Sequence, residues 1–492
     1  MIMAVPGYAA GPRSAQVTRS VQRGPWMQSR ICTPPRWPAI CAAVALLALP
    51  AYVQAAEAPS EPAAAIALPP VEPAAVPGSS LRILRLTDAL QVALANQPQL
   101  RMTRAATTAA KSRAAQVHTG LLPVISATAQ YQRTTGNFAP RPGTVVPAKS
   151  TVSLAPSFDL FNVGVQASQL VYDFGQTADR EAAASQAADA LQANEKTTEL
   201  LVIAAARRAY FQARAQMALL AVAHETLANH RRHVRQIEGF VAAGTRPEFD
   251  LVQVRTNVSN AEVGVIAAQT AYDLGRAQLN QALGVLGDVD FDVGDDEQPP
   301  VPGEDGPQQA LVDQAIANRP ELLALERQRK QQELALRALH SSLWPVVAVT
   351  AAATEAGVAV GGLVPNWNVG ATLNWALFQG GMNKAQVAEA NANLAGLEGQ
   401  NKLQLLQIQS DIAQARLAVR AAKATIVAAE DAQNNAKELL RLAEARYRAG
   451  LGNGIELNDA QLAFTNAAVQ VIAARYNLST ARAQLLLSLG QP

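Results

Sequence analysis

The sequence predicts an α+β membrane protein with an internal duplication, in which strands form a β-barrel and long antiparallel helices continue it as a coiled-coil tunnel. Three observations predict this class. The same motifs occur twice at constant spacing, two short segments in each copy alternate apolar and polar residues, and long stretches without glycine or proline show heptad spacing. Helices of this length exceed what a compact domain needs, and alternating strands fit the wall of a membrane barrel.

The composition excludes several functional classes. The chain has 41 Lys and Arg against 39 Asp and Glu, so no basic excess argues for a nucleic-acid partner. After the N-terminal region no apolar run is long enough for a membrane helix, so any membrane insertion of the mature chain must use strands. No nucleophile is paired with a base in a recognisable motif. We therefore expect neither an enzyme nor a cofactor or metal ion.

The N-terminal residues predict export. Arg30 and Arg36 precede an apolar stretch from Ala39 to Leu49, and Val53-Gln54-Ala55 follows as a small-residue cleavage site. The apolar stretch is too short for a stable membrane anchor. We therefore expect residues 1–55 to be a signal peptide.

Three further features belong to this region. Met27 is an alternative start, because the basic segment before the apolar stretch is unusually long. Cys32 and Cys41 both lie in the part that cleavage would remove, and each follows an isoleucine rather than a lipoprotein cleavage motif. The mature chain should therefore lack thiols and a lipid anchor. Residues 56–80 are rich in Pro and Ala and predict an extended linker.

Repeated motifs show the duplication. Asn96-Gln97-Pro98-Gln99-Leu100 recurs as Asn318-Arg319-Pro320-Glu321-Leu322 with an offset of 222 residues (320 − 98). Further along the chain, Ala243-Gly244 recurs as Ala449-Gly450 with an offset of 206 (450 − 244). The chain is therefore two repeats, expected at 81–286 and 308–490 and joined by an acidic linker at 287–307. The change of 16 residues (222 − 206) is assigned to a Gly/Pro-rich loop at 135–150, because loops tolerate insertions.

Each repeat is expected to contain one β-hairpin, at 124–172 and at 346–378. The segment from Asn366 to Phe378 alternates most clearly. Its apolar face has Trp367, Val369, Ala371, Leu373, Trp375 and Leu377, and its polar face has Asn366, Asn368, Gly370, Thr372 and Asn374. The half-buried sheet of a soluble protein would alternate in the same way, so that alternative stays open here.

Aromatic residues favour the membrane alternative. Trp367 and Trp375 are eight residues apart in the sequence, which in a strand is roughly 26 Å, close to the apolar band between the aromatic girdles of a membrane barrel. Phe161 is the corresponding girdle residue that we expect in the first repeat.

The number of strands predicts a homotrimer. Four strands cannot enclose a lumen, and open strand edges are not tolerated in lipid. Two chains would give eight strands, whose interior is filled by side chains. Three chains would give twelve strands and leave room for a water-filled lumen.

The helical segments predict coiled-coil packing. Residues 176–238 contain neither Gly nor Pro, and as one helix they would extend roughly 95 Å. The matching stretch of the second repeat has apolar residues at heptad spacing, as does the helix that follows it. The seam positions of these two helices are Leu405, Ile408, Ile412, Ala415, Val419, Ala422, Ile426, Ala429, Gln433, Ala436, Leu440, Ala443 and Tyr447, and then Leu457, Ala460, Phe464, Ala467, Val471, Ala474, Leu478, Ala481 and Leu485. The return helix of the first repeat has the same spacing at Leu251, Val254, Val258, Ala261, Val265, Ala268 and Tyr272. Short turns at Gly244 and Gly450 make the paired helices antiparallel.

Together, the order of these elements, the repeated Asn-x-Pro-x-Leu motif, Leu121-Leu122-Pro123-Val124-Ile125 before a strand and the Tyr-x-x-Gly motif resemble the TolC-type outer membrane factor family over residues 81–490. The resemblance implies a trimeric, twelve-stranded barrel in the outer membrane whose helices extend into the periplasm. It implies an exit duct of a tripartite export system. An exported or periplasmic coiled-coil scaffold without channel activity is the alternative, but it leaves the interrupting strands unexplained.

The resemblance also implies partners. A periplasmic adaptor and an inner-membrane transporter, either of the ABC or of the proton-driven type, would meet the far end of the tunnel, and outer-membrane lipid would surround the barrel. The cargo stays open between polypeptides, as in type I secretion, and small toxic compounds.

In this family the far end of the tunnel closes near the two helix turns, where a Tyr-x-x-Gly motif is followed by acidic residues. The resemblance assigns this role to Tyr447, to Glu456 and Asp459 after Gly450, and to Asp250 after Gly244. Glu456 and Asp459 are three residues apart and each precedes a seam residue, so both can face a lumen, where they would attract cations. Solvated acids at a helix start are the alternative, because the helix dipole favours them there. Gly452 stands where the family often has a basic residue.

Three other patterns predict no site. Gly450-Leu451-Gly452-Asn453-Gly454 follows no strand, unlike a phosphate-binding loop. Asp288, Asp290 and Asp292 lack the glutamate that completes a calcium loop. His224, His230 and His233 lie on one predicted helix without the motif of a zinc site.

Overall fold

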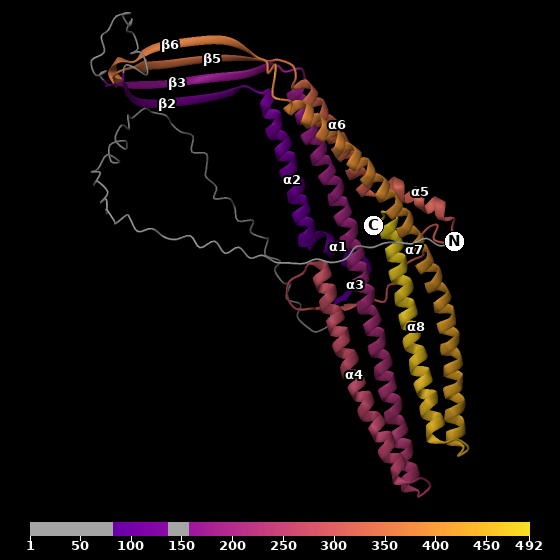
Figure 1. The fold of residues 1–492 in the computed structure, drawn as a ribbon. Helices are drawn as coiled ribbons and strands as arrows, with labels where there is room; N and C mark the ends of the chain where they lie inside the picture. The colour runs from indigo at the N-terminus through magenta and orange to yellow at the C-terminus, as the bar shows by residue number, and fades with distance from the viewer. Residues whose placement is uncertain (1–81, 136–156) are drawn as a thin grey trace, which may run out of the picture. The chain divides into compact units, whose positions relative to one another are not determined.

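The computed structural model describes residues 82–135 and 157–492 (Figure 1). The predicted signal peptide at 1–55, the linker at 56–80 and nearly all of the loop at 135–150 lie outside the described residues. Within those described, no helix is both long enough and apolar enough to cross a membrane.

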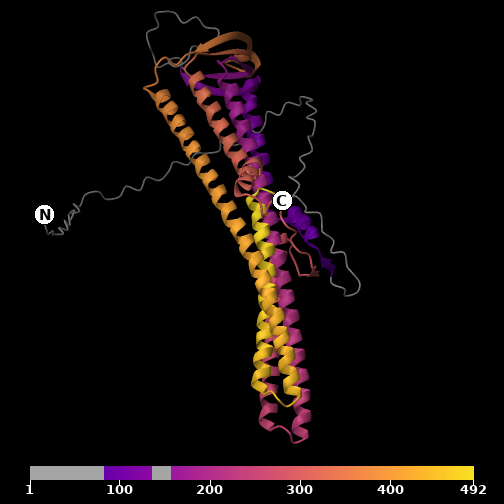
Figure 2. The same cartoon turned by 90° about the vertical axis from the view of Figure 1, so that its right-hand side faces the viewer.

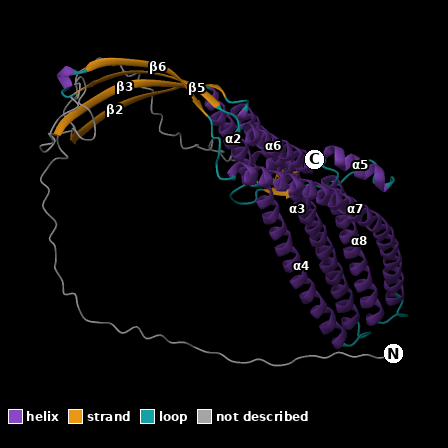
Figure 3. Ribbon diagram, turned by 45° about the horizontal axis from the view of Figure 1, so that its top comes forward, coloured by secondary structure: helices purple, strands orange, loops and turns teal. Residues whose placement is uncertain are grey.

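Four strands form one antiparallel sheet in the order β2-β3-β5-β6 (Figure 3). The first repeat supplies β2 (Val124–Thr135) and β3 (Ser157–Tyr172), and the second supplies β5 (Val346–Gly357) and β6 (Val364–Asn374). A short 3-10 turn (Val360–Gly362) lies between β5 and β6. Because β3 pairs with β5, the two hairpins join into one sheet, and β2 and β6 are its edges among the described residues.

The pairing register gives this sheet one apolar and one polar face. Directly paired residues point to the same side, and successive residues alternate. One rung of the apolar face is Ala127, Val165, Ala353 and Trp367, and the neighbouring rung of the polar face is Thr128, Gly164, Thr354 and Asn366. Trp367 is 82% exposed, so nothing in the described chain covers the apolar face. A half-buried sheet of a soluble protein would have this face covered by another part of the chain or by a partner, and no described part of the chain covers it.

The last strand is shorter than the alternation predicts. β6 ends at Asn374, which pairs with Val346, and the residue before Val346 is Pro345, which has no N–H to continue the ladder. Trp375 lies directly after the strand, where its indole Nε1 donates to the carbonyl of Leu343 at 3.0 Å. Apolar alternation up to Phe378 therefore extends beyond the residues that pair.

Among the described residues, each repeat contains two short and two long helices. The short ones are α1 (Leu86–Asn96), α2 (Pro98–His118), α5 (Gln308–Asn318) and α6 (Pro320–Ser341), and a 3-10 turn (Thr119–Leu121) follows α2. Pro98 and Pro320 start their helices, where a missing N–H costs nothing. The long ones are α3 (Gln176–Ala242), α4 (Glu248–Leu283), α7 (Met382–Arg448) and α8 (Gly454–Ser488).

The helices pack side by side in two layers, one next to the turns and one next to the sheet (Figures 1 and 2). Next to the turns the order is α4-α3-α8-α7, and next to the sheet it is α2-α3-α6-α7. Most of the seam positions named above for α7 and α8 are buried, and the others, Leu405, Ile426, Gln433, Leu440, Phe464 and Leu478, are half-buried. This confirms the predicted heptad packing of this pair. α3 is central in both layers, whereas α7 is at the edge of both.

A second, smaller sheet was not predicted. β1 (Arg82–Leu84) pairs in parallel with β4 (Phe291–Val293), which lies in the segment expected to be an acidic linker. Two three-residue strands are too short to show alternation in a sequence.

Acidic residues of that segment fasten it to the helices. Asp296 accepts hydrogen bonds from the backbone N–H of Leu86 at 3.0 Å and from the hydroxyl of Tyr210 at 2.7 Å, and these bonds lower the pKa of Asp296. Glu304 is 4% exposed and pairs with Arg482 at 3.1 Å and Lys423 at 2.7 Å. Burial alone would raise the pKa of Glu304, but the hydrogen bonds from these cations outweigh it and lower the pKa.

The two longest helices differ in their glycines. α7 contains Gly396 and Gly399, and neither has an atom within 4 Å of the position a Cβ would take. The corresponding residues of α3 are Ala190 and Ala193 (offset 206), and both are buried. α3 is therefore packed with alanine where α7 has open space.

Candidate functional site at the helix turns

The two turns that connect the long helices have the same construction. Gly244 and Gly450 have φ of +71° and +73°, the left-handed conformation that ends many helices and that glycine adopts without a Cβ penalty. After α3, the N–H of Thr245 bonds to the carbonyl of Phe240 at 3.0 Å, and after α7 the N–H of Leu451 bonds to the carbonyl of Arg446 at 2.9 Å. The predicted turn glycines therefore do cap α3 and α7.

One apolar cluster joins all four long helices next to these turns. Its buried members are Ile237 of α3, Val254 of α4, Ala443 and Tyr447 of α7, and Leu457 and Ala460 of α8. The two repeats are thus packed against each other at the turns.

Tyr447 lies at the centre of this contact. Its side chain is 3% exposed and its ring meets the ring of His233 edge-on, with centroids 5.3 Å apart. On the same tyrosine, the guanidinium of Arg246 lies 5.1 Å from the ring centroid, a cation–π distance. Burial raises the pKa of Tyr447, so its hydroxyl stays protonated.

Asp250 belongs to the same group of residues. It lies in the first turn of α4 and is half-buried, with its carboxylate 3.7 Å from Arg246. Arg246 therefore bridges Asp250 of the first repeat and Tyr447 of the second. The structure brings together these two predicted residues through a third that the prediction did not include.

Glu456 and Asp459 are placed differently. Glu456 pairs with Arg446 at 3.1 Å, and its backbone N–H bonds to the side chain of Asn453, which caps α8, at 2.7 Å. Asp459 is exposed one turn further along α8. Leu457 and Ala460 are buried, so the two acids point away from the packed seam, as predicted.

Sequence reasoning missed Arg246, Arg446 and the role of His233. Arg246 lies four residues before Asp250, in the turn just before α4, and this short spacing was a usable signal for an ion pair. His233 was considered only as a metal ligand. In the part of the chain that the structure describes, no group of three or more His, Cys, Asp or Glu side chains is placed to hold a metal ion.

Aromatic residues gather at both ends of the large sheet. At the end away from the helices, Phe161 contacts Tyr131 with ring centroids 5.1 Å apart. At the end next to the helices, Phe174 contacts both Tyr172 at 4.8 Å and Trp344 at 5.3 Å. Trp375 follows β6 at this second end, whereas Trp367 lies within the strand. Trp375 directly follows Asn374, the last paired residue of β6, so the predicted extension of this strand to Phe378 is wrong, while the girdle role of the two tryptophans stays a prediction.

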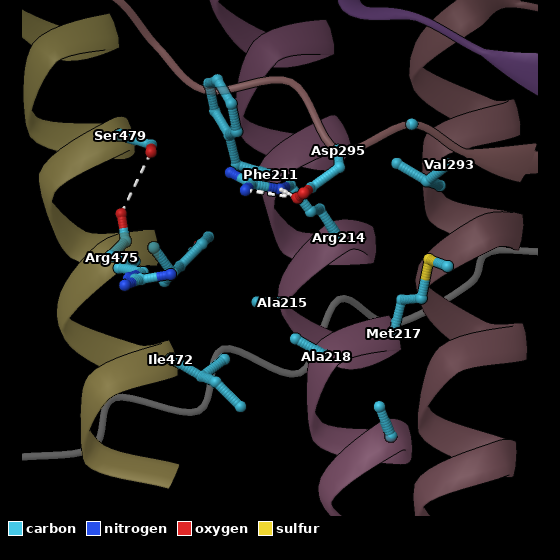
Figure 4. Close-up of a pocket in the computed structure, with 13 residues that line it drawn as sticks. Phe211, Arg214, Ala215, Met217, Ala218, Val293, Asp295, Ile472, Arg475 and Ser479 are labelled. Atoms are coloured by element: carbon cyan, nitrogen blue, oxygen red, sulfur yellow. Dashed lines mark hydrogen bonds and ion pairs between the residues drawn. The ribbon is translucent and has the colours of Figure 1, made fainter. Parts of the chain in front are cut away.

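A separate cavity of about 380 Å³ lies between α3, α8 and the residues that follow β4 (Figure 4). Phe211, Met217 and Ile472 supply apolar walls, and Arg214 pairs with Asp295 at 2.5 Å beside them. The cavity lies more than twenty residues along α3 from the turn and shares no residue with the cluster described above.

Comparison with known proteins gives one family. The family model described as outer membrane efflux protein matches residues 89–285 and 311–491. The chain is 25% identical over 332 residues to the probable efflux pump outer membrane protein SepC of Pseudomonas putida, a match that covers 64% of the chain and 66% of SepC. The chain is 24% identical over 396 residues to outer membrane protein OprJ of Pseudomonas aeruginosa, covering 77% of each.

A solved structure agrees in fold. The crystal structure of CusC superposes with a TM-score of 0.71 at 17% identity and covers 83% of this chain and 92% of CusC.

Proposed function

Since this chain belongs to the outer membrane efflux protein family, we propose that three copies of it form one channel through the outer membrane, as the exit duct of a tripartite efflux system. One observation carries the proposal: every layer of the chain has a first-repeat element at one edge and a second-repeat element at the other. The sheet has β2 and β6, the layer next to it has α2 and α7, and the layer next to the turns has α4 and α7. A contact between two different edges can repeat from one copy to the next, and it closes into a ring when the rotation between neighbouring copies allows it.

Apolar residues on the edge helices support this assembly. They lie outside the packed seam, and successive members are three, eight or ten to twelve residues apart. On α4 they are Val252, Val263, Ile266 and Leu274, and on α7 they are Leu403, Leu406, Leu417, Val427, Leu439 and Leu442. Each is between 46% and 67% exposed in the single chain. Large apolar side chains exposed repeatedly along one helix are the kind of surface that marks an interaction site.

The duplication predicts how neighbouring copies pair their strands. Within the chain, β3 of the first repeat pairs with β5 of the second, for example Ala167 with Ala351. Shifting each residue to its counterpart in the other repeat (167 + 206 and 351 − 222) gives Leu373 of β6 opposite Ala129 of β2. We therefore expect Leu373 of one copy to face Ala129 of the next.

Disulfide cross-linking tests this register. Cys32 and Cys41 are the only natural cysteines and lie in the predicted signal peptide. In the full-length chain, Leu373→Cys combined with Ala129→Cys should oxidise to a covalent trimer on a denaturing gel, because directly paired Cβ atoms are about 5 Å apart. The matched control pairs Leu373→Cys with Ile125→Cys, four residues and about 13 Å along β2. Equal cross-linking of both pairs, or dimers alone, would contradict the assembly.

In this ring the polar face of the sheet lines the lumen and the apolar face meets lipid. The periplasmic ends are the helix turns, where Asp250, Tyr447, Glu456 and Asp459 form the entrance, and the aromatic residues Phe161, Trp367 and Trp375 lie towards lipid. We propose a periplasmic adaptor and an inner-membrane transporter as partners. Small toxic compounds are the proposed cargo, because SepC is named as a probable efflux pump component. Polypeptide passage gains no support from that name.

Efflux is measurable in the host cell. Removing the chain should raise the accumulation of a fluorescent dye, and returning the natural chain should lower it again. A chain without effect on any small compound tested, but required for export of a protein, would overturn the proposed cargo and leave the channel intact.

A further inference from the structure

The contact between His233 and Tyr447 joins the first repeat to the second at the turns. His233 belongs to α3 and lies four residues, about one helical turn, before Ile237 of the apolar cluster that joins the four long helices. A cavity of about 200 Å³ opens beside the contact. Its walls include Arg232 and Gln236 of α3, Glu444 and Arg448 of α7, and Gln461 of α8.

We propose that His233 and Tyr447 form a pH-sensitive contact, which holds the two repeats together at the turns while His233 is neutral and releases them when His233 is protonated. This inference rests on the proposed channel function, because a looser contact at the turns matters only if they surround an entrance. His233 acts here as a positioning residue, since it touches another side chain and no cargo.

The charges around His233 make protonation unfavourable. Arg232 and His230 share its helix, and Glu444 and Arg448 face it from α7, where they pair with each other at 3.1 Å. From the turn, Arg246 covers the Tyr447 ring and is paired in turn with Asp250. The lining from α8, Leu457 and Gln461, is uncharged. Three guanidinium groups therefore face two carboxylates, and both carboxylates are already engaged by arginines.

Burial of the His233 side chain also makes its protonation unfavourable. It lowers the pKa of His233, and the neighbouring His230 lowers it further, whereas a hydrogen bond with Gln236 and the charge of Glu444 oppose the change with smaller effect. A histidine whose pKa is lowered in the packed state stabilises that state fully above its ordinary pKa of about 6.5. The stabilisation is lost as the pH falls through the lowered value. Mild acid should therefore separate the repeats at the turns.

Planar bilayers containing the full-length channel test the proposal. As the periplasmic side is acidified from pH 7.5 to pH 4.5, the open fraction of the natural channel should rise by up to about tenfold per pH unit for each histidine that takes up a proton. His233→Gln, which stays neutral, should remove this rise. The matched control is His224→Gln, at an exposed position of the same helix, and it should behave as the natural channel does.

A second variant distinguishes release of the contact from a folding defect. His233→Arg carries a permanent charge, and it should be open already at pH 7.5, while its yield of trimer equals that of His233→Gln. A natural channel that conducts but responds to acid identically with and without His233 overturns this inference. A protein that never conducts, whatever the pH, overturns the proposed function instead.

Discussion

Phe174 shows, at the scale of one residue, that the two repeats form the same turn with different residues. It has φ of +57°, in the left-handed region, where the corresponding residue of the second repeat is Gly380 with φ of +61°. A residue with a Cβ loses about 1–2 kcal/mol in this conformation. The stacking of Phe174 on Trp344 offsets that loss and links the start of α3 to the start of β5.

Substitutions at this position separate the two effects. Phe174→Ala removes the stacking and keeps the strain, whereas Phe174→Gly removes both. The alanine variant should therefore be the less stable of the two, by about 1 kcal/mol. Thermal unfolding in detergent, compared with the natural protein, measures the order. Equal midpoints for the two variants would mean that the positive φ costs nothing here.

The acids of α8 give a second prediction for single residues. In a trimer, Glu456 and Asp459 would place six carboxylates around one entrance, which concentrates cations there. Replacing both with Ala should weaken the block of the channel by divalent cations added on the periplasmic side. Glu438, exposed on α7 and paired with Arg441 at 2.7 Å, provides a control substitution that should leave the block unchanged. Unchanged block in the double variant would identify Glu456 and Asp459 as ordinary solvated acids.

At the scale of whole elements, sequence reasoning succeeded where one local pattern decides the packing. Most heptad positions of α7 and α8 are buried, and the rest are half-buried, because α8 lies between α3 and α7 and each of the two helices faces a long partner. In α4, whose predicted seam includes Val258 and Val265, only Val254 and Tyr272 of that seam are fully buried. α4 is an edge helix and packs mainly against α3, so its seam stays half-covered in a single chain.

Contacts between segments that lie far apart along the chain could not be predicted from the sequence. The pairing of β1 with β4 and the anchoring of Glu304 depend on residues that lie far apart along the chain. The bridge from Arg246 to Tyr447 has the same cause, because Arg246 lies in the turn after α3 of the first repeat and Tyr447 lies near the end of α7 of the second. A periodic pattern indicates which face of a helix is buried, but it does not identify the partner.

Ile412 and Leu417 of α7 test this view of the helix. Ile412 is fully buried in the seam, and Ile412→Ala should destabilise the protein by about 2–4 kcal/mol through the cavity that it leaves. Leu417 is 62% exposed, and Leu417→Ala removes a side chain of the same size from the opposite face. Chemical denaturation of the dissociated chain should show a large effect for Ile412 and nearly none for Leu417. Similar losses at both positions would contradict the assigned seam.

For the whole molecule, membership of the family confirms the outer membrane as its location and excludes an enzyme. The fold class predicted from the sequence is confirmed by the likeness to CusC. The number of copies remains a prediction from the four strands of each chain and their two open edges.

Charges placed on an edge helix test the assembly. Val263 and Ile266 of α4 are 66% and 67% exposed, so replacing both with Asp should leave the chain folded. In the trimer the same carboxylates would be buried against the neighbouring α7, which is strongly unfavourable for unpaired charge. Native mass measurement should therefore find monomers with unchanged helical content. Persistent trimers would place the interface elsewhere.

The glycines of α7 give the long helices unequal stiffness. A helix interior loses about 1 kcal/mol for each glycine that replaces alanine, and glycine sites are where helices bend most readily. Gly396 and Gly399 lie one turn apart in α7, while α3 has buried alanines at both places. Under a sideways force at the turns, we therefore expect α7 to bend near Gly396 and Gly399, and α3 to stay straighter over the corresponding stretch. In a ring of three copies, stiffer and more flexible helices would therefore alternate around the axis. A tunnel of six near-identical helix pairs would then deform with threefold symmetry.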